Sequence, residues 1–219
     1  MTNNYDQIAG SYDMLSRLVF RKSIVHSQQV LLPFLNVPSR LLIVGGGTGW
    51  ILEELAKIHA SGFTVTYVEI SCKMIDLAKK RDFKQNQVSF IHTAIEDFES
   101  NEQFDAVMTP FLFDNFGSER AARVFTILDR QLVEDGMWLF TDFHIDKKIN
   151  GTWQKILLKS MYLFFKILSH VEASRLPEME PLFNDGGYAV MHKSYHFRGF
   201  IQSVVYRKIR SAQPASDQK

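Results

Sequence analysis

The residues best placed to do chemistry are a run of glycines near the start of the chain. Residues 41–44 are apolar, and an amphipathic run begins at Trp50. Between them lies a glycine-rich turn that consists of Gly45, Gly46, Gly47, Thr48 and Gly49. This order predicts a buried strand, a tight turn and a helix. Because the first turn of a helix presents unpaired N–H groups and a partial positive charge, the turn is suited to a ligand with an anionic group.

The spacing of the glycines indicates what kind of ligand this would be. A dinucleotide turn reads G-x-G-x-x-G, but here Trp50 occupies the place of its third glycine, and no Lys follows Gly49 as in a phosphate loop. The next predicted strand, 63–70, carries Glu69 at its end, 20 residues after Gly49, about where an acid that binds a ribose is expected. Together these features predict a nucleoside ligand. The alternative is a bare tight turn and a solvated glutamate.

Composition excludes several other classes of protein. The chain has 219 residues, of which 46% are hydrophobic and 22% charged, which is ordinary for one globular domain. A net charge of +1 creates no broad field that would recruit nucleic acid. The single cysteine, Cys72, allows no internal disulfide, and no Cys/His cluster suggests a metal site. We find no signal peptide and no run of 18 apolar residues, so we expect a cytoplasmic protein without a transmembrane segment, whose oligomeric state stays open.

The elements that must position the glycine turn alternate between strands and helices. The predicted strands are 41–44, 63–70, 88–91, 104–109 and 137–143, and the predicted helices between them are 50–59, 72–81 and 118–132. Apolar strands in such an alternation predict a parallel sheet that is covered on both faces. A turn is expected at Asp135-Gly136.

The end of the chain departs from this alternation. Two predicted strands, 188–197 and 200–208, are separated only by Arg198-Gly199, and so short a link requires an antiparallel hairpin. The fold class is therefore α/β: a Rossmann-like, doubly wound, seven-stranded sheet that is mostly parallel, with a C-terminal antiparallel hairpin. We expect a single domain over 1–210, with an N-terminal helical cover over 1–40, a helical insertion or lid over 150–187 and a disordered tail over 211–219.

Five motifs in this order resemble those of class I S-adenosylmethionine-dependent methyltransferases. They read VGGGTG, YVEIS, VSFIHTAIEDF, FDAVMTP and LVEDGMWLFTDF, and the resemblance extends over residues 5–208. The opening, in which YDQIA is followed by a second Tyr-Asp pair at Tyr12, resembles methyltransferases of quinone biosynthesis, in which this segment covers the cofactor. The resemblance implies S-adenosyl-L-methionine as the cofactor.

The resemblance also implies which residues bind this cofactor. They are Tyr12, Gly45, Gly46, Gly47, Thr48, Gly49, Glu69, Ile70, Ser71, Met74, Ala94, Ile95, Thr109 and Pro110. In the family the glycine turn holds the methionine part, Glu69 binds the ribose hydroxyls, and Thr109 and Pro110 lie near the donor methyl group. Two positions depart from the family pattern. Ile43 stands where an acid is usual on the first strand, and Ala94 stands where an Asp usually binds the adenine amino group, a role that Glu96 or Asp97 could take over.

The catalytic groups and the substrate are less defined by the sequence. A base for an O- or C-acceptor would come from the strand ends, where His144 and Asp142 are the candidates, with Asp114 and His26 as further ones. The aromatic, lysine-bearing segment 153–171 predicts a lid or pocket wall for a small apolar molecule. Phe111, Phe113 and Phe116 would line the same pocket.

Several alternatives stay open. The segment 153–171 could instead be an outer helix packed on the sheet, or a helix that contacts a membrane surface. The chain as a whole could be a non-catalytic S-adenosylmethionine-binding protein, because Ile43 and Ala94 depart from the family pattern. A dinucleotide-dependent oxidoreductase is the other class of enzyme, against which Trp50 and the terminal hairpin argue.

Overall fold

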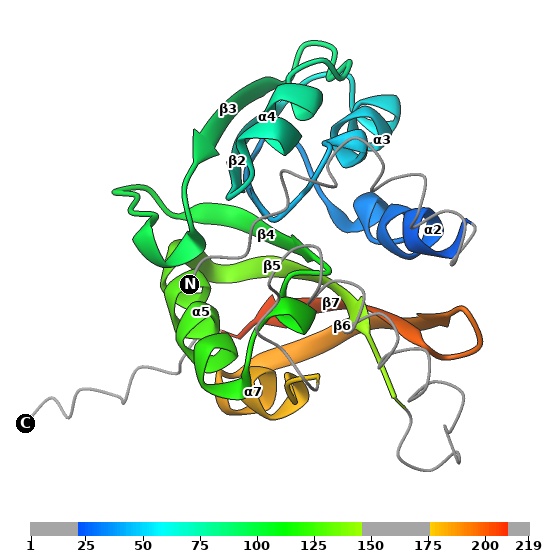
Figure 1. The fold of residues 1–219 in the computed structure, drawn as a ribbon, viewed down its shortest axis with the longest axis vertical. Coiled ribbons are helices and arrows are strands. Elements are labelled where there is room, and N and C mark those ends of the chain that lie inside the picture. The colour runs from blue at the N-terminus through cyan, green and yellow to red at the C-terminus, as the bar shows by residue number, and fades with distance from the viewer. Residues whose placement is uncertain (1–21, 146–175, 210–219) are drawn as a thin grey trace, which may run out of the picture.

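The computed structural model describes residues 22–145 and 176–209 of the chain. These residues form a seven-stranded sheet in the order β3-β2-β1-β4-β5-β7-β6 (Figure 1). The strands are β1 (Ser39–Val44), β2 (Phe63–Glu69), β3 (Gln87–His92), β4 (Phe104–Pro110), β5 (Leu132–Phe143), β6 (Tyr188–His196) and β7 (Ile201–Lys208). Strands β1 to β5 pair in parallel, and β7 is antiparallel to both β5 and β6. The predicted fold class, including the antiparallel hairpin, is confirmed.

Helices cover both faces of the sheet. The helices are α2 (Ser23–Gln29), α3 (Trp50–Ile58), α4 (Cys72–Ala78), α5 (Ser118–Gln131) and α7 (Glu180–Asp185). Three short 3-10 turns, η1 (Leu32–Phe34), η2 (Ile95–Asp97) and η3 (Phe113–Asn115), complete the described elements. The alternation of side chains along β1 shows how the two layers arise. Leu41 and Ile43 pack with the buried residues of α3 on one face, and Leu42 and Val44 pack with those of α5 on the other.

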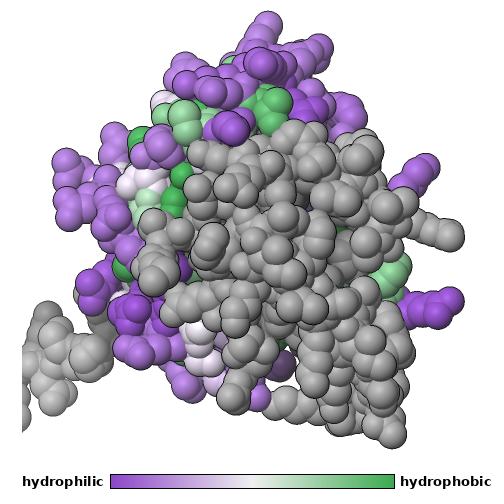
Figure 2. Space-filling view, viewed as in Figure 1, coloured by the Kyte–Doolittle hydropathy of each residue, from purple (hydrophilic) through white to green (hydrophobic). Residues whose placement is uncertain are grey.

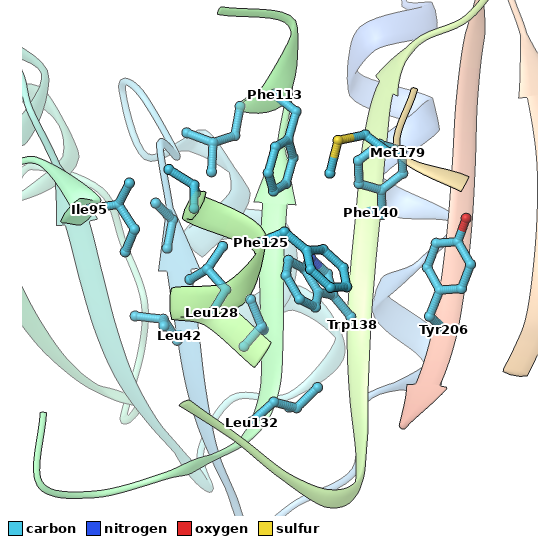
Figure 3. Packing of buried hydrophobic residues seen from close by; sticks show 14 of the residues in the cluster. Leu42, Ile95, Phe113, Phe125, Leu128, Leu132, Trp138, Phe140, Met179 and Tyr206 are labelled. Atoms are coloured by element: carbon cyan, nitrogen blue, oxygen red, sulfur yellow. The ribbon is translucent and has the colours of Figure 1, made fainter. Parts of the chain in front are cut away.

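An aromatic cluster anchors the α5 face (Figure 3). The fully buried Trp138 of β5 stacks on Phe125 of α5, with ring centroids 5.0 to 5.1 Å from those of both Phe125 and Phe183. Phe183 of α7 in turn stacks on Tyr206 of β7 at 3.8 Å. The Trp138 indole donates a hydrogen bond of 2.9 Å to the hydroxyl of Thr109 on β4, so its polar atom is satisfied inside the core. This cluster ties the antiparallel hairpin to the parallel part of the sheet.

Several predicted boundaries are wrong. The hairpin turn spans four residues, because β6 ends at His196 and β7 begins at Ile201, although the pairing is antiparallel as expected. The turn expected at Asp135-Gly136 lies within β5, where Asp135 has a positive φ of 63° and the register with β4 shifts between Phe104 and Ala106.

The predicted helices are also shorter than expected. The helix expected over 72–81 ends at Ala78, and the one expected over 118–132 ends at Gln131, after which the chain turns into β5. Between β3 and β4 the crossover contains only the 3-10 turn η2 among the described elements. Helix ends fray into tighter turns, which periodicity alone does not reveal.

The helical insertion expected within 150–187 is only partly described. Its segment 153–171 lies outside the described residues, as do the N-terminal positions through residue 21 and the expected tail over 211–219. On the face shown in Figure 2, the described residues that are visible are mostly hydrophilic, with a few small apolar patches. No helix among residues 22–145 and 176–209 is both long and apolar enough to cross a membrane.

Two glycines offer a matched test of the packing around α3 and α5. A Cβ at Gly49, whose φ is +75°, would lie 2.5 Å from Cβ of Ala78, so Gly49→Ala is expected to destabilise the protein by about 2–4 kcal/mol. Gly117, the N-cap of α5, has extended backbone and open space around it. Gly117→Ser is therefore expected to stabilise the protein by about 0.5–1 kcal/mol by adding a capping hydroxyl. Urea unfolding of both variants checks this, and equal effects of the two would contradict it.

A histidine cluster between α2 and β6 makes stability depend on pH. The rings of His26 and His196 are 5.4 Å apart, and burial lowers the pKa of His196, with His26 and His192 lowering it further. The pKa of His196 in the folded protein lies below its unfolded value of about 6.5, so the unfolded chain binds the proton more readily. The contribution of His196 to stability is therefore lost as pH falls from about 6.5 through the folded pKa. We expect the wild type to lose more stability than His196→Gln between pH 7.5 and 5.5, measured by urea unfolding. The same loss in both proteins would exclude this role.

Candidate functional site

The glycine turn at the end of β1 is fixed by close packing on three sides. Gly45, Gly47 and Gly49 have φ values of +68°, +62° and +75°, which L side chains rarely adopt. A Cβ at Gly46 would lie 2.4 Å from the hydroxyl of Tyr67, and one at Gly49 would strike Ala78 on α4. The Tyr67 hydroxyl also donates a 3.0 Å hydrogen bond to the Gly47 carbonyl. The turn therefore presents bare backbone at the carboxyl end of β1, as the sequence predicts.

Glu69, at the end of β2, faces this turn. Only 5% of its surface is exposed, and its two carboxylate oxygens accept hydrogen bonds from the amides of Gly47 at 3.1 Å and Ser71 at 3.0 Å. Burial raises the pKa of Glu69, while these amides lower it in part. A carboxylate has about four lone-pair sites, so Glu69 can still accept a hydrogen bond from a ligand. This arrangement suits a vicinal diol.

The residues after Glu69 are placed as expected. Ser71 caps α4, where its hydroxyl accepts from the Met74 amide at 3.2 Å. The sulfur of Met74 would lie 3.6 Å from a Cβ on Gly47, so Met74 and the glycine turn are close. Ile70 lies between Glu69 and Ser71 in the sequence, and its carbonyl oxygen is 3.0 Å from Nε2 of His92 on β3. The structure thus gathers the glycine turn, Glu69 and the start of α4 in one place.

Arg81 is a residue that the sequence analysis missed. Its Nε donates to the Thr48 carbonyl at 3.0 Å, and a terminal nitrogen lies 3.4 Å from the Thr48 hydroxyl. The guanidinium also lies 3.6 Å from the carboxylate of Glu53 on α3. Arg81, which follows α4 in the sequence, therefore links Thr48 of the glycine turn to Glu53 of α3. No sequence signal points to it, since an arginine after a helix is ordinary.

A second turn, the β4 turn (residues 111–116), packs on the glycine turn. The side chain of Leu112 would lie 3.1 Å from a Cβ on Gly45. Phe111 has a positive φ of 51°, a strained conformation for a residue with a side chain, and its amide donates to the Thr141 carbonyl of β5 at 2.8 Å. The side-chain amide of Asn115 donates to the Phe111 and Leu112 carbonyls, at 2.9 and 3.2 Å. The turn is thereby held in one conformation.

Asp142, near the end of β5, fixes the β4 turn through hydrogen bonds to its backbone. Its Oδ2 accepts from the amides of Phe113 at 3.1 Å and Asp114 at 3.2 Å, and its Oδ1 accepts from its neighbour Phe143 at 2.8 Å. Asp142 is 4% exposed. Its carboxylate is thus committed to three backbone N–H groups, which makes Asp142 a positioning residue in this structure.

Asp114 and Asp142 form a carboxyl pair. Burial raises the pKa of Asp142 to about 7. Burial also raises the pKa of Asp114 well above its ordinary value, and the charge of Asp142 raises it further. The three backbone donors favour the ionised form of Asp142, and its charge opposes ionisation of Asp114, whose Oδ1 accepts a hydrogen bond of 2.9 Å from the side chain of Asn115. The sequence analysis named both residues but gave no reason to pair them.

The remaining predicted residues lie around this edge of the sheet in different surroundings. Thr109 is fully buried and its hydroxyl faces Trp138, while Pro110 ends β4. Ala94 precedes η2, and Ile95 is buried in the α5 cluster. His144 follows β5, where its ring lies 5.2 Å from that of Tyr195 and its amide donates to Phe200. The predicted contact by Tyr12 lies outside the described residues. Among the described residues, no group of acidic, His or Cys side chains could hold a metal ion.

A family model and several curated relatives indicate the type of domain. Residues 41–136 match the family model described as "Methyltransferase domain". The ubiquinone/menaquinone biosynthesis C-methyltransferase UbiE of Rhodopseudomonas palustris (strain TIE-1) is 29% identical over 116 residues, which cover 49% of this chain and 46% of that protein. The chain thus matches less than half the length of this curated relative. The class of domain predicted from the motifs is confirmed.

Solved structures show the same fold at low identity. One is magnesium protoporphyrin IX methyltransferase (ChlM) from Synechocystis PCC 6803 with bound SAH, with a TM-score of 0.65 and 17% identity over 93% of this chain and 96% of that one. Another is the N-methyltransferase NodS from Bradyrhizobium japonicum WM9 in complex with S-adenosyl-l-homocysteine, with a TM-score of 0.64 and 13% identity over 87% of each chain. At these identities the likeness concerns the fold.

The two acids of the pair should differ in what they contribute to stability. In Asp142→Asn the amide group replaces one of the two acceptor oxygens, so a buried backbone N–H loses its partner and we expect a loss of about 2–4 kcal/mol. In Asp114→Asn an amide of the same shape replaces a carboxyl whose ionisation is opposed by burial and by the charge of Asp142, so the change should stay within about 1 kcal/mol. Urea unfolding at pH 7 measures both. A larger loss for Asp114→Asn would contradict the assignment of roles.

Proposed function

We propose that this chain catalyses methyl transfer from S-adenosylmethionine to a small apolar molecule. Its residues 41–136 match a methyltransferase domain, and its sheet has the class I methyltransferase topology. The observation that carries the proposal is the pairing of the bare glycine turn with the buried carboxylate of Glu69. When bound, S-adenosylmethionine supplies a methyl group that its sulfonium activates for in-line displacement. The protein's contribution is to hold donor and acceptor in line.

The residues present fit this cofactor. The glycine turn presents backbone without side chains at the carboxyl end of β1, which suits close approach by the methionine part. Glu69 can still accept a hydrogen bond from a ribose hydroxyl, and Met74 lies beside the turn at the start of α4. Ligands of open α/β sheets bind at the carboxyl ends of the strands, where the strand order reverses, and here that point lies between β1 and β4.

Glu96 is our proposed replacement for the missing acid near the adenine. Glu96 pairs with Arg120 of α5 through Oε1, while its Oε2 is buried and has no hydrogen-bond partner among the described residues. A buried acceptor without a donor is unfavourable, so a donor from a ligand would be stabilised there. We therefore assign the adenine amino group to Glu96 and not to Asp97, which is exposed.

An apolar substrate is supported by the aromatic side chains at the ends of β4 and β5. Phe143 and Phe200 are buried with ring centroids 5.1 Å apart, and Phe111 lies 5.0 Å from Phe143. Aromatic walls with few polar groups are typical of small-molecule sites. The relative from Rhodopseudomonas palustris is named as a C-methyltransferase of ubiquinone/menaquinone biosynthesis, which suggests a quinone-like acceptor. His144, at the same edge, is the candidate base for an acceptor that must lose a proton.

Binding of S-adenosylhomocysteine tests the cofactor assignment. We expect the wild type to bind it in titration calorimetry, and Glu69→Gln to bind at least about tenfold more weakly, because the amide replaces an acceptor of a ribose hydroxyl with a donor. Glu99→Gln, at an exposed glutamate, should bind like the wild type. NAD serves as the control ligand. Binding of NAD in place of S-adenosylhomocysteine would favour an oxidoreductase, and cofactor binding without turnover on a panel of quinols and phenols would favour a non-catalytic protein.

A further inference from the structure

We propose that Tyr67 is a positioning residue of the cofactor site, which together with Arg81 fixes two carbonyl groups of the glycine turn and thereby makes the site favour ligands that carry an amino-acid part. The inference rests on the proposed function and deepens it. Neither residue needs to touch the ligand, because each acts through the backbone of the turn.

Tyr67 supports the glycine turn from β2. Its side chain is fully buried, and its hydroxyl donates a hydrogen bond of 3.0 Å to the Gly47 carbonyl. The same side chain lies against Gly46, where a Cβ would be 2.4 Å from the hydroxyl oxygen. Tyr67 therefore contacts two consecutive residues of the turn.

The ring of Tyr67 is held in place independently of its hydroxyl. It packs with the apolar side chains of the α3 face, and its centroid lies 5.4 Å from that of Phe90 on β3. Removing only the hydroxyl keeps this packing but takes a donor away from the Gly47 carbonyl. The change to Phe thus isolates one hydrogen bond to the turn.

Two consecutive carbonyls of the turn accept hydrogen bonds from side chains. Tyr67 donates to the carbonyl of Gly47, and Arg81 donates to that of Thr48 at 3.0 Å. The amide of Gly47 donates in turn to Glu69 at 3.1 Å. Because a peptide group is planar, a bond to its carbonyl fixes the direction of its N–H group as well. The orientation of successive peptides in the turn is therefore determined by Glu69, Tyr67 and Arg81.

This orientation matters most for the part of the ligand that lies against the turn. In the proposed function the methionine part contacts the glycine turn, whereas Glu69 binds the ribose. The methionine part carries an ammonium and a carboxylate group, which require carbonyl oxygens and N–H groups in fixed directions. A nucleoside without these groups depends less on the peptides of the turn. The role of Tyr67 and Arg81 should therefore be visible as selectivity between two ligands.

Calorimetry with two thioether nucleosides tests this without any methyl acceptor. We titrate S-adenosylhomocysteine, and 5′-methylthioadenosine, which lacks the amino-acid part, into the full chain. We expect Tyr67→Phe to bind S-adenosylhomocysteine about five- to twentyfold more weakly than the wild type, because the buried Gly47 carbonyl loses its donor. Its affinity for 5′-methylthioadenosine should stay within about threefold of the wild type. Arg81→Gln should shift the ratio of the two affinities in the same direction, and it tests the proposal even where Tyr67→Phe fails to fold.

Tyr188→Phe is the matched control, because it removes another hydrogen-bonded hydroxyl from a buried tyrosine. Tyr188 is 6% exposed and donates to Asp129 at 2.7 Å. It begins β6, at the edge of the sheet opposite the carboxyl ends of the parallel strands. Both Tyr67→Phe and Tyr188→Phe should lose stability in urea, but Tyr188→Phe should keep the wild-type ratio of the two affinities.

The outcomes separate this inference from the proposed function. An unchanged affinity ratio in a folded Tyr67→Phe, or an equal loss for both ligands, would overturn the positioning role while leaving the cofactor assignment intact. An equal shift of the ratio in Tyr188→Phe would overturn it as well, because lost stability alone would then explain the effect. Failure of the wild type to bind either ligand would overturn the proposed function and this inference with it.

Discussion

The lack of space around the glycine turn is the constraint on which the site depends. Side chains from three elements meet three different glycines: Tyr67 of β2 at Gly46, Ala78 of α4 at Gly49, and Leu112 of the β4 turn at Gly45. A Cβ added at Gly46 or Gly49 would collide with its neighbour, and one at Gly45 would force Leu112 to shift. The turn is therefore positioned by packing, with Arg81 fastening Thr48 from outside. A ligand meets a backbone whose conformation is set before it arrives, so little ordering opposes binding.

The buried acids on either side of this turn act on backbone N–H groups in different ways. Glu69 accepts the amides of Gly47 and Ser71, one on each oxygen, whereas Asp142 accepts two amides of the β4 turn and that of its neighbour Phe143. We thus assign a buried acid a binding role at one strand end and a positioning role at another. What separates them is where the donors belong: those of Glu69 lie in the glycine turn and before α4, and two of those of Asp142 lie in the β4 turn.

Much of the fold could be predicted because it depends on local patterns. The apolar strand before Gly45, the cap at Ser71 and the short link near Gly199 each indicated their element and, together, the sheet topology. The bulge at Asp135 could not be predicted, because Asp-Gly indicates a turn whether or not pairing continues on both sides. The clamp by Arg81 and the pairing of Asp114 with Asp142 depend on contacts between residues 28 to 33 positions apart, which no local pattern encodes.

The two departures from the family pattern are connected by this geometry. Ile43, where an acid is usual, is fully buried among the apolar side chains of the α3 face, so a carboxylate there would have to be desolvated at considerable cost. The acid near the glycine turn is instead Asp142, which the strand order brings next to the end of β1 through β4. In the same way, Glu96 offers near Ala94 the acceptor that alanine lacks. The chain thus replaces polar contacts on the strands with acids held by neighbouring turns, where backbone amides or Arg120 offset the cost of burying them.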